Sequence, residues 1–62
     1  SLKGASLKGA KLHNADFSKA DLTGADLSGA DVKDADFDGA ILTDVKGLER
    51  LAGRERARNL SQ

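Results

Sequence analysis

Five aspartates recur at intervals of five residues along the middle of the chain, at Asp16, Asp21, Asp26, Asp31 and Asp36. Carboxylates can ligate a cation or act as general acids and bases. If the chain turns within each interval, successive members fall on different faces and do not converge on one site. Asp16 and Asp36 would stack, and they could share a cation or simply face water. We expect all five to be solvated and to accept hydrogen bonds from neighbouring backbone groups.

The other polar residues do not form a recognised catalytic pattern. His13 is the only histidine, and no second ligand or nucleophile accompanies it, so we expect a surface residue. Cysteine is absent, which excludes disulfides and thiolate-bound zinc. No phosphate-binding loop is present. The sequence therefore predicts no catalytic, cofactor-binding or metal-binding residue and indicates that the protein is not an enzyme.

The spacing of five extends beyond the aspartates. Eight units cover residues 5–44: ASLKG, AKLHN, ADFSK, ADLTG, ADLSG, ADVKD, ADFDG and AILTD. In each unit an alanine (in the last, Ala40) stands two places before a larger apolar residue, which we call the centre: Leu7, Leu12, Phe17, Leu22, Leu27, Val32, Phe37 and Leu42. Helices repeat every 3.6 residues and strands every two, so neither has this period. The alternation within each unit favours a very short extended side, and the Gly, Asn or Asp that ends most units favours a tight corner.

Four sides would close one coil of 20 residues, so that residues 20 positions apart would stack. The two aromatic residues, Phe17 and Phe37, have this separation, and Leu2, Leu22 and Leu42 would form another column. Neighbouring coils would then pair in parallel at about 4.8 Å.

Units of the form A-D/N-L-x-x resemble those of pentapeptide-repeat proteins. That family forms a right-handed, four-sided parallel β-helix with the centre and the preceding alanine pointing inward. The resemblance implies an all-β solenoid over residues 1–44, with about two coils of a right-handed quadrilateral parallel β-helix, and a bacterial or cyanobacterial source. We expect all eight centres and all eight alanines to be buried, because a narrow coil has room for a large residue only beside a small one.

Turn chemistry gives a finer prediction at the corners. A type II turn needs a positive φ at its third residue, which glycine supplies freely. We therefore expect type II corners at Gly4, Gly9, Gly24 and Gly29. Lys19 should avoid a positive φ and form a type I or irregular corner.

The period of five ends at Val45, and residues 45–62 are expected to form a separate C-terminal cap and tail. Leu48 and Leu51 would fall on one side of a short α-helix and pack over Leu42 or Phe37. Such a cap would cover the apolar residues and unpaired backbone groups at one end of the solenoid.

Three arginines of this tail, Arg50, Arg54 and Arg58, would share another side of the helix at i, i+4 and i+8. Local pairing with the acidic residues of the preceding coil is the simpler explanation for them. A basic docking element is the alternative, so these three are the candidate partner-binding residues.

Charge is balanced overall, with ten basic and ten acidic residues, but it is unevenly distributed. Residues 1–20 carry four lysines and one aspartate, residues 21–44 carry seven aspartates and one lysine, and residues 45–62 carry five basic and two acidic side chains. The balanced total argues against direct, charge-driven binding of nucleic acid. No apolar run is long enough for membrane insertion. We expect a cytoplasmic protein, with a thylakoid-associated compartment left open.

These features favour a non-catalytic scaffold or protein–protein interaction module. The N-terminal coil has no cap in this sequence, so its edge is expected to meet upstream residues or a protein partner, through homo-oligomer formation or end-to-end stacking of coils. The alternative, implied by the family resemblance, is a DNA-mimicking modulator of type II topoisomerase (DNA gyrase). Those relatives are long, strongly acidic rods, and the zero net charge and short rod disfavour this alternative.

Overall fold

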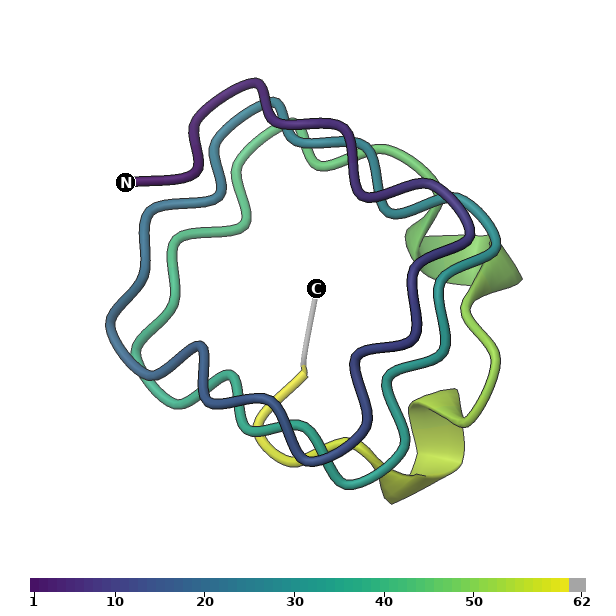
Figure 1. Ribbon diagram of the computed structural model, residues 1–62. Helices are drawn as coiled ribbons and strands as arrows, with labels where there is room; N and C mark the ends of the chain where they lie inside the picture. The colour runs from purple at the N-terminus through teal and green to yellow at the C-terminus, as the bar shows by residue number, and fades with distance from the viewer. Residues whose placement is uncertain (61–62) are drawn as a thin grey trace.

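The computed structural model describes residues 1–60, and its chain winds through stacked turns around a common axis (Figure 1). We call them coil 1 (residues 1–20), coil 2 (21–40) and coil 3 (41–60). Parallel bridges join residues 20 positions apart, pairing Ser6 with Asp26, Lys11 with Asp31, Asp16 with Asp36, Asp21 with Ile41 and Asp26 with Lys46. The successive bridge residues after Ser6 are Lys11, Asp16, Asp21 and Asp26, and Asp26 is the partner of Ser6. Each coil therefore has four sides. The predicted 20-residue offset is therefore confirmed.

Each side of a coil is held by one bridge residue, and each corner is a tight turn. At a typical corner the N–H of Ala10 donates to the carbonyl oxygen of Leu7 at 3.1 Å. Only a single residue per side is extended enough to pair, and residues 1–60 contain neither a β-strand nor an α-helix. The predicted all-β class is therefore seen only as isolated parallel bridges.

The corners share a positive φ whatever residue occupies them. Gly4, Gly9, Gly24 and Gly29 have φ values of 69° to 71°, the sign expected for the third residue of a type II turn. The prediction for Lys19 is wrong, because its φ is 61°. A left-handed conformation costs a side-chain-bearing residue about 1–2 kcal/mol. At Lys19 the coil imposes it, because the corner N–H donates to the carbonyl oxygen of Asp38 in the next coil at 2.8 Å.

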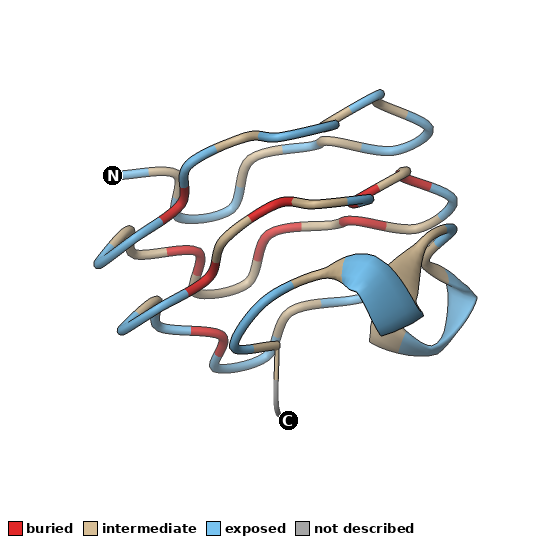
Figure 2. Ribbon diagram, turned by 90° about the horizontal axis from the view of Figure 1, so that it is seen from below, coloured by how far each residue is buried: buried red, intermediate tan, exposed pale blue. Residues whose placement is uncertain are grey.

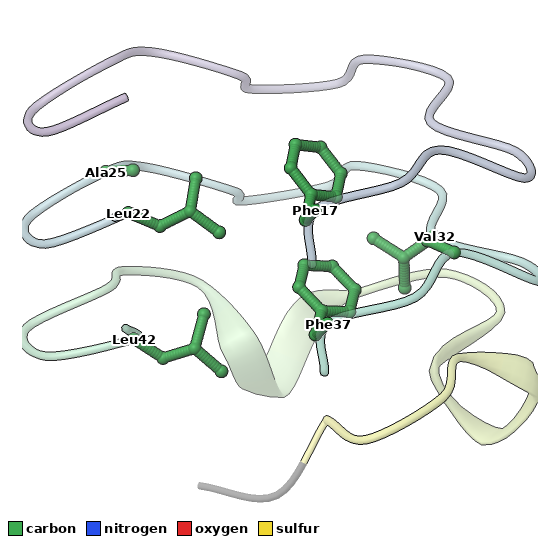
Figure 3. Packing of buried hydrophobic residues seen from close by; sticks show 7 residues of the cluster. Phe17, Leu22, Ala25, Val32, Phe37 and Leu42 are labelled. Carbon is green, nitrogen blue, oxygen red and sulfur yellow. The ribbon is translucent and has the colours of Figure 1, made fainter. Parts of the chain in front are cut away.

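The apolar core lies inside coil 2 and the adjoining parts of its neighbours (Figures 2 and 3). Six residues of coil 2 are completely buried: Leu22, Ala25, Leu27, Ala30, Val32 and Ala35. The rings of Phe17 and Phe37 stack with their centroids 5.1 Å apart and their planes at 11°, which confirms the predicted column. The aromatic stack and the column of Leu22 over Leu42 fill the space between the coils (Figure 3).

The prediction that every centre and every alanine is buried is wrong for two centres and five alanines. Leu7 and Leu12 are only half-buried, and so are their alanines, Ala5 and Ala10. Their outer side faces away from coil 2, where no other described part of the chain lies (Figure 2). Ala15, Ala20 and Ala40 are also half-buried, whereas Phe17 of coil 1 and Leu42 of coil 3 are buried, so burial is most complete in the middle of the stack.

The predicted α-helical cap is also wrong, because residues 45–60 continue the path as coil 3. The bridges Asp31–Ala52 and Asp36–Arg58 join residues 21 and 22 positions apart, so each of two successive units contains one additional residue. Two short 3₁₀ helices absorb the additional residues, η1 (Leu48–Arg50) and η2 (Arg54–Arg56). Residues 61–62 of the predicted tail lie outside the described residues.

Glycine makes this change of spacing possible at Gly47 and Gly53, which directly precede η1 and η2. Gly47 has φ 84°, and a Cβ there would lie 2.5 Å from the backbone N and Cα of Ser28 in coil 2. A side chain at this position would therefore push coil 3 away from coil 2. Of the two leucines predicted to cover the core, Leu51 packs against it, whereas Leu48 lies in η1, which has no buried residue.

Candidate functional site

The five aspartates all accept a hydrogen bond from the backbone two residues further on. The Oδ1 atoms of Asp16, Asp21, Asp26, Asp31 and Asp36 accept from the N–H groups of Ser18, Thr23, Ser28, Lys33 and Asp38 at 2.9 to 3.1 Å. These bonds form Asx turns that bind one more N–H group at each corner. The carboxylates therefore act on their own backbone, as the sequence predicts, and only Asp16 and Asp36 share a side of the stack.

The same bonds lower the pKa of each carboxyl group, because they favour its charged form. The hydrogen bonds from Thr23 lower the pKa of Asp21, and the charge of Lys3 lowers it further. The bonds from Ser28 lower the pKa of Asp26, with smaller contributions from Lys8 and Lys46. The lysines belong to the coils on either side, so charge also links the coils.

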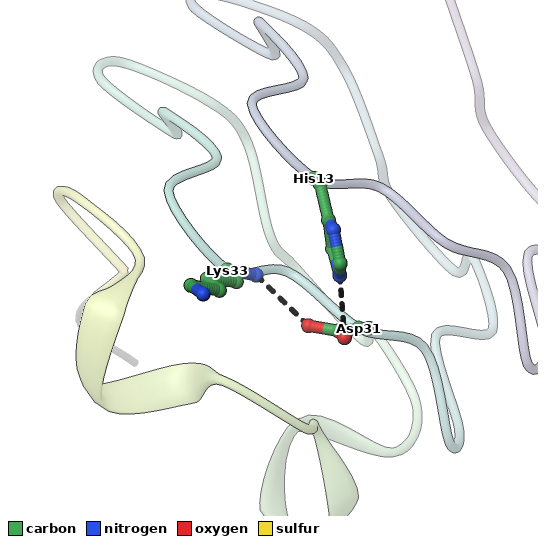
Figure 4. Close-up of polar contacts among 3 residues, drawn as sticks. All are labelled: His13, Asp31 and Lys33. Carbon is green, nitrogen blue, oxygen red and sulfur yellow. Dashed lines mark hydrogen bonds and ion pairs between the residues drawn. The ribbon is translucent and has the colours of Figure 1, made fainter.

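One close side-chain pair joins coil 1 to coil 2: the Nε2 atom of His13 lies 2.6 Å from Oδ2 of Asp31 (Figure 4). This bond, followed by the one from the Lys33 N–H, lowers the pKa of Asp31. The His13 side chain is about half exposed, with 48% of its surface accessible, in agreement with the expected surface position. Its partner was missed, although the stacking of Lys11 on Asp31 places His13 two residues further along the same side.

Coil 3 contacts the acidic side chains of coil 2 through polar groups that the sequence analysis did not select. The Nδ2 atom of Asn59 donates to Oδ1 of Asp36 at 3.1 Å, and this bond is the main cause of the lowered pKa of Asp36. Arg56 forms a longer contact, with its Nη2 atom 3.4 Å from Oδ1 of Asp34. Both contacts span more than 20 residues, so only the stacking of coils brings these groups together.

The three candidate partner-binding arginines do not share a helix face, because the helix that would align them does not form. Arg54 is half-buried in η2 and donates from Nη1 to the carbonyl oxygen of Leu48 at 2.8 Å, so it joins the two 3₁₀ helices. Arg50 is exposed at the end of η1. Arg58 is exposed and its backbone bridges Asp36. A binding role for the three residues remains a prediction.

Nothing in residues 1–60 resembles an enclosed reaction site. No pocket is present in this part of the protein. Its histidine and acidic residues do not gather into a group of three that could hold a metal ion. None of its helices is long and apolar enough to cross a membrane. The surfaces that could make contacts are therefore the sides of the coils and the two ends of the stack.

The outer side of coil 1 carries backbone groups that are paired at the equivalent positions of coil 2. In coil 2 the N–H groups of Asp26, Asp31 and Asp36 donate to the carbonyl oxygens of Ala5, Ala10 and Ala15, each at 2.9 Å. In coil 1 the equivalent N–H groups belong to Ser6, Lys11 and Asp16, and none has a backbone partner among residues 1–60. We call the backbone N–H and C=O groups of these three residues the coil 1 edge.

Comparison with protein families gives one match. The family model for pentapeptide repeats matches residues 5–44 with eight copies, the same eight units that the spacing defines. A search of curated proteins found no match. The matched segment covers well over half of the chain and contains coil 2 and most of coil 1. The chain therefore belongs to the pentapeptide-repeat family.

Proposed function

We propose that this chain is a non-catalytic protein-interaction module, and that the coil 1 edge is the surface through which it pairs with another polypeptide segment. In finer structural terms, we propose that the coils form a short right-handed, four-sided parallel β-helix. Membership of a repeat family is consistent with interaction or structural roles. The observation that carries the proposal is the row of N–H groups of Ser6, Lys11 and Asp16 without backbone partners in residues 1–60.

An unpaired edge of this kind favours addition of another chain, because each outward N–H and C=O group gains a hydrogen-bond partner. The apolar residues beside the edge support the same conclusion. Leu2, Leu7 and Leu12 pack on the core from one side and are only half-buried. A further chain segment in register would cover these leucines and, at the same time, form hydrogen bonds with the N–H and C=O groups of the edge.

The alternative, DNA mimicry directed at a type II topoisomerase, has less support. Only coil 2 has an excess of acidic residues, with six aspartates and one lysine. Coil 1 has four lysines and one aspartate, and coil 3 has five basic and three acidic residues. A DNA mimic needs a continuous acidic surface, whereas here basic coils lie on both sides of one acidic coil.

Peptides selected from a randomised displayed library, with the folded chain as bait, provide the test. We expect the selected peptides to slow the exchange of the amide hydrogens of Ser6, Lys11 and Asp16, measured residue by residue with NMR. Binders that protect only other surfaces, such as the neighbourhood of Arg50 and Arg58, would show that the edge is not the interaction surface.

A pair of variants sharpens this test. Lys11→Pro removes the N–H that has no partner in the described chain, whereas Lys11→Ala keeps it and removes the charged side chain. The proposal expects binding to fall with proline beyond the change with alanine, while thermal unfolding shows that both variants remain folded. Ser6→Pro and Ser6→Ala repeat the comparison at a second side. Equal binding by proline and alanine variants at both sides would contradict the proposal.

A further inference from the structure

The contact between coil 1 and coil 2 joins a basic layer to an acidic one. Lys3 and Lys8 of coil 1 contribute to the lowered pKa values of Asp21 and Asp26 in coil 2, after the hydrogen bonds from Thr23 and Ser28. On the next side, His13 contacts Asp31 at 2.6 Å. Three of the four sides of coil 1 therefore have a basic or imidazole group close to a carboxylate of the coil below.

The basic side chains of coil 1 are also accessible to solvent. Lys3, Lys8, Lys11 and Lys19 are all exposed. Lys11 occupies the bridge position itself, so a segment added to the coil 1 edge would place its own bridge residue directly over Lys11. Asp16 holds the same position on the following side, where a second carboxylate would meet a like charge.

We infer that the coil 1 edge binds an acidic peptide, paired in parallel as coil 2 is, that follows the edge around the corner between Ser6 and Lys11 and places a carboxylate over each of them. This inference rests on the proposed function and names the chemistry of its partner. An Ala-Asp-Leu pattern meets all the requirements: the apolar residue after each aspartate faces inward over Leu7 or Leu12, each alanine faces inward over Ala5 or Ala10, and each aspartate faces outward. The segment Ala25–Val32, ADLSGADV, has this pattern and pairs with the opposite side of coil 1, where Leu7 N–H donates to Asp26 O at 2.8 Å. On the coil 1 edge, the alanine C=O and leucine N–H of the peptide would instead pair with Ser6, as those of Ala5 and Leu7 pair with Asp26.

A second copy of the chain fits this edge less well. Its own coil 1 carries the same positive charge, so two such edges would bring lysines together. Its coil 3 has glycines, Gly47 and Gly53, directly after the bridge residues Lys46 and Ala52, where the regular units have an inward-facing centre. Neither coil 1 nor coil 3 of a second copy supplies the acidic, regularly spaced segment that coil 2 supplies.

Nucleic acid matches the charge of coil 1 but not the rest of the edge. Phosphate oxygens can accept from lysines and from N–H groups, but they donate no hydrogen bond to the carbonyl oxygens of Ser6 and Lys11. A nucleic-acid strand also lacks aliphatic side chains spaced to cover Leu7 and Leu12. A polypeptide meets both requirements.

The experiment uses the whole chain and three capped peptides with the sequences ADLSGADV, ANLSGANV and AKLSGAKV. Binding is followed by NMR titration, and edge pairing by exchange of the Ser6 and Lys11 amides. We expect the acidic peptide to slow exchange at both amides and to bind up to about fivefold more tightly than the asparagine peptide, because the carboxylate over Lys11 gains an exposed charge pair. The lysine peptide should bind most weakly, and added salt should weaken the acidic peptide alone.

A matched substitution tests the charge assignment. Lys11→Glu should reverse the order of affinities, so that the lysine peptide binds more tightly than the acidic one. Lys33→Glu, at an exposed lysine of coil 2 away from the edge, should leave the acidic peptide as the tighter binder. Unfolding curves confirm that both variants are folded, and Lys11→Gln replaces the first if glutamate unfolds it, with the prediction that all three peptides become more nearly equal.

The outcomes separate this inference from the proposed function. Equal protection of the edge amides by all three peptides would overturn the acidic preference and leave edge pairing intact. Tighter binding of an eight-residue thymidine oligonucleotide at the same amides would replace the acidic peptide with a nucleic acid. If none of the peptides protects the edge amides, the inference is overturned. The displayed-peptide selection would then show whether the coil 1 edge is an interaction surface at all.

Discussion

Coil 1 and coil 3 both form an outer layer of the described stack, but their contacts with coil 2 differ. Coil 1 is built from five-residue units, keeps the 20-residue offset, and leaves regularly spaced N–H groups on its outer side. Coil 3 has two six-residue units, two 3₁₀ helices, and glycines that approach coil 2 closely. Strict repetition thus preserves an edge that another regular coil can continue, whereas added residues and missing centres disturb the register.

The largest effect that would distinguish the two outer coils is expected at their glycines. Gly47→Ala places a Cβ 2.5 Å from the Ser28 backbone at a φ of 84°, while Gly4→Ala has the same left-handed backbone and no atom within 4 Å. We expect Gly47→Ala to lower the free energy of unfolding by about 2–5 kcal/mol from overpacking and backbone strain together, and Gly4→Ala by about 1–2 kcal/mol from strain alone.

Urea unfolding of both variants measures this difference. The total stability of a 62-residue chain is about 3–9 kcal/mol, so Gly47→Ala should leave a marginally folded protein. Equal losses for the two variants would show that the contact of coil 3 with Ser28 is not tight.

A second effect tests the difference between the middle coil and coil 1. Ala25 is completely buried, whereas Ala5, twenty residues earlier, is half-buried. Ala25→Leu should therefore destabilise by about 1–3 kcal/mol through overpacking. Ala5→Leu should cost less, because its added atoms can extend past the open side of coil 1. Thermal unfolding of the two variants compares them directly, and a larger loss at Ala5 would contradict the burial pattern.

Acid should affect the contacts of coil 2 with both neighbours. The lowered pKa values of the five aspartates mean that the unfolded chain binds protons more readily than the folded one. Their contribution to stability is therefore present above about pH 4, the ordinary aspartate value, and is lost as the pH falls through the lowered values. Urea midpoints measured from pH 7 to pH 2 should fall at the acid end. A midpoint that stays constant throughout would contradict the shifts.

The smallest expected effect is a change in the pKa of one carboxyl group, which distinguishes the contact of coil 2 with coil 1 from its contact with coil 3. Removing a donor that lowers a carboxyl pKa should return that pKa toward its ordinary value. His13→Ala should thus raise the pKa of Asp31 without changing Asp36, and Asn59→Ala should do the reverse. NMR titration of the two carboxyl groups reports each contact separately. A rise at both sites in either variant would indicate that the coils move together.

The sequence was sufficient for the regular part of the fold because the period, the alanine positions and the Phe17–Phe37 separation all indicated the same coil. It failed at Lys19, where the path of the coil overrides the preference of the residue. It failed in the tail for a different reason: Leu48 and Leu51 are three residues apart, as in a helix, but the inward positions are Val45, Leu51 and Ala57, six residues apart. The spacing alone did not reveal that 3₁₀ turns absorb the additional residues.

The candidate site was less predictable from sequence than the fold. Outward aspartates in Asx turns follow from residue type and local spacing, and they were predicted. The His13–Asp31 and Asn59–Asp36 contacts depend on which corner lies over which, so they required the register between coils. The coil 1 edge was expected because any uncapped end of a stack leaves backbone groups unpaired. That Lys11 occupies a bridge position on this edge could be recognised only from the bridges themselves.

The single-residue bridges have a consequence for how the protein folds. Apart from the corner turns and 3₁₀ helices, backbone hydrogen bonds in the described chain join residues about 20 positions apart, beginning with Leu2 to Asp21 at 2.8 Å. No hairpin is available to start the process, so the first pair of coils must close a loop of about 20 residues before any bridge forms. Such non-local pairing slows folding relative to helical proteins of similar length. Once one pair of coils exists, it acts as a template, and each further coil can add along it side by side.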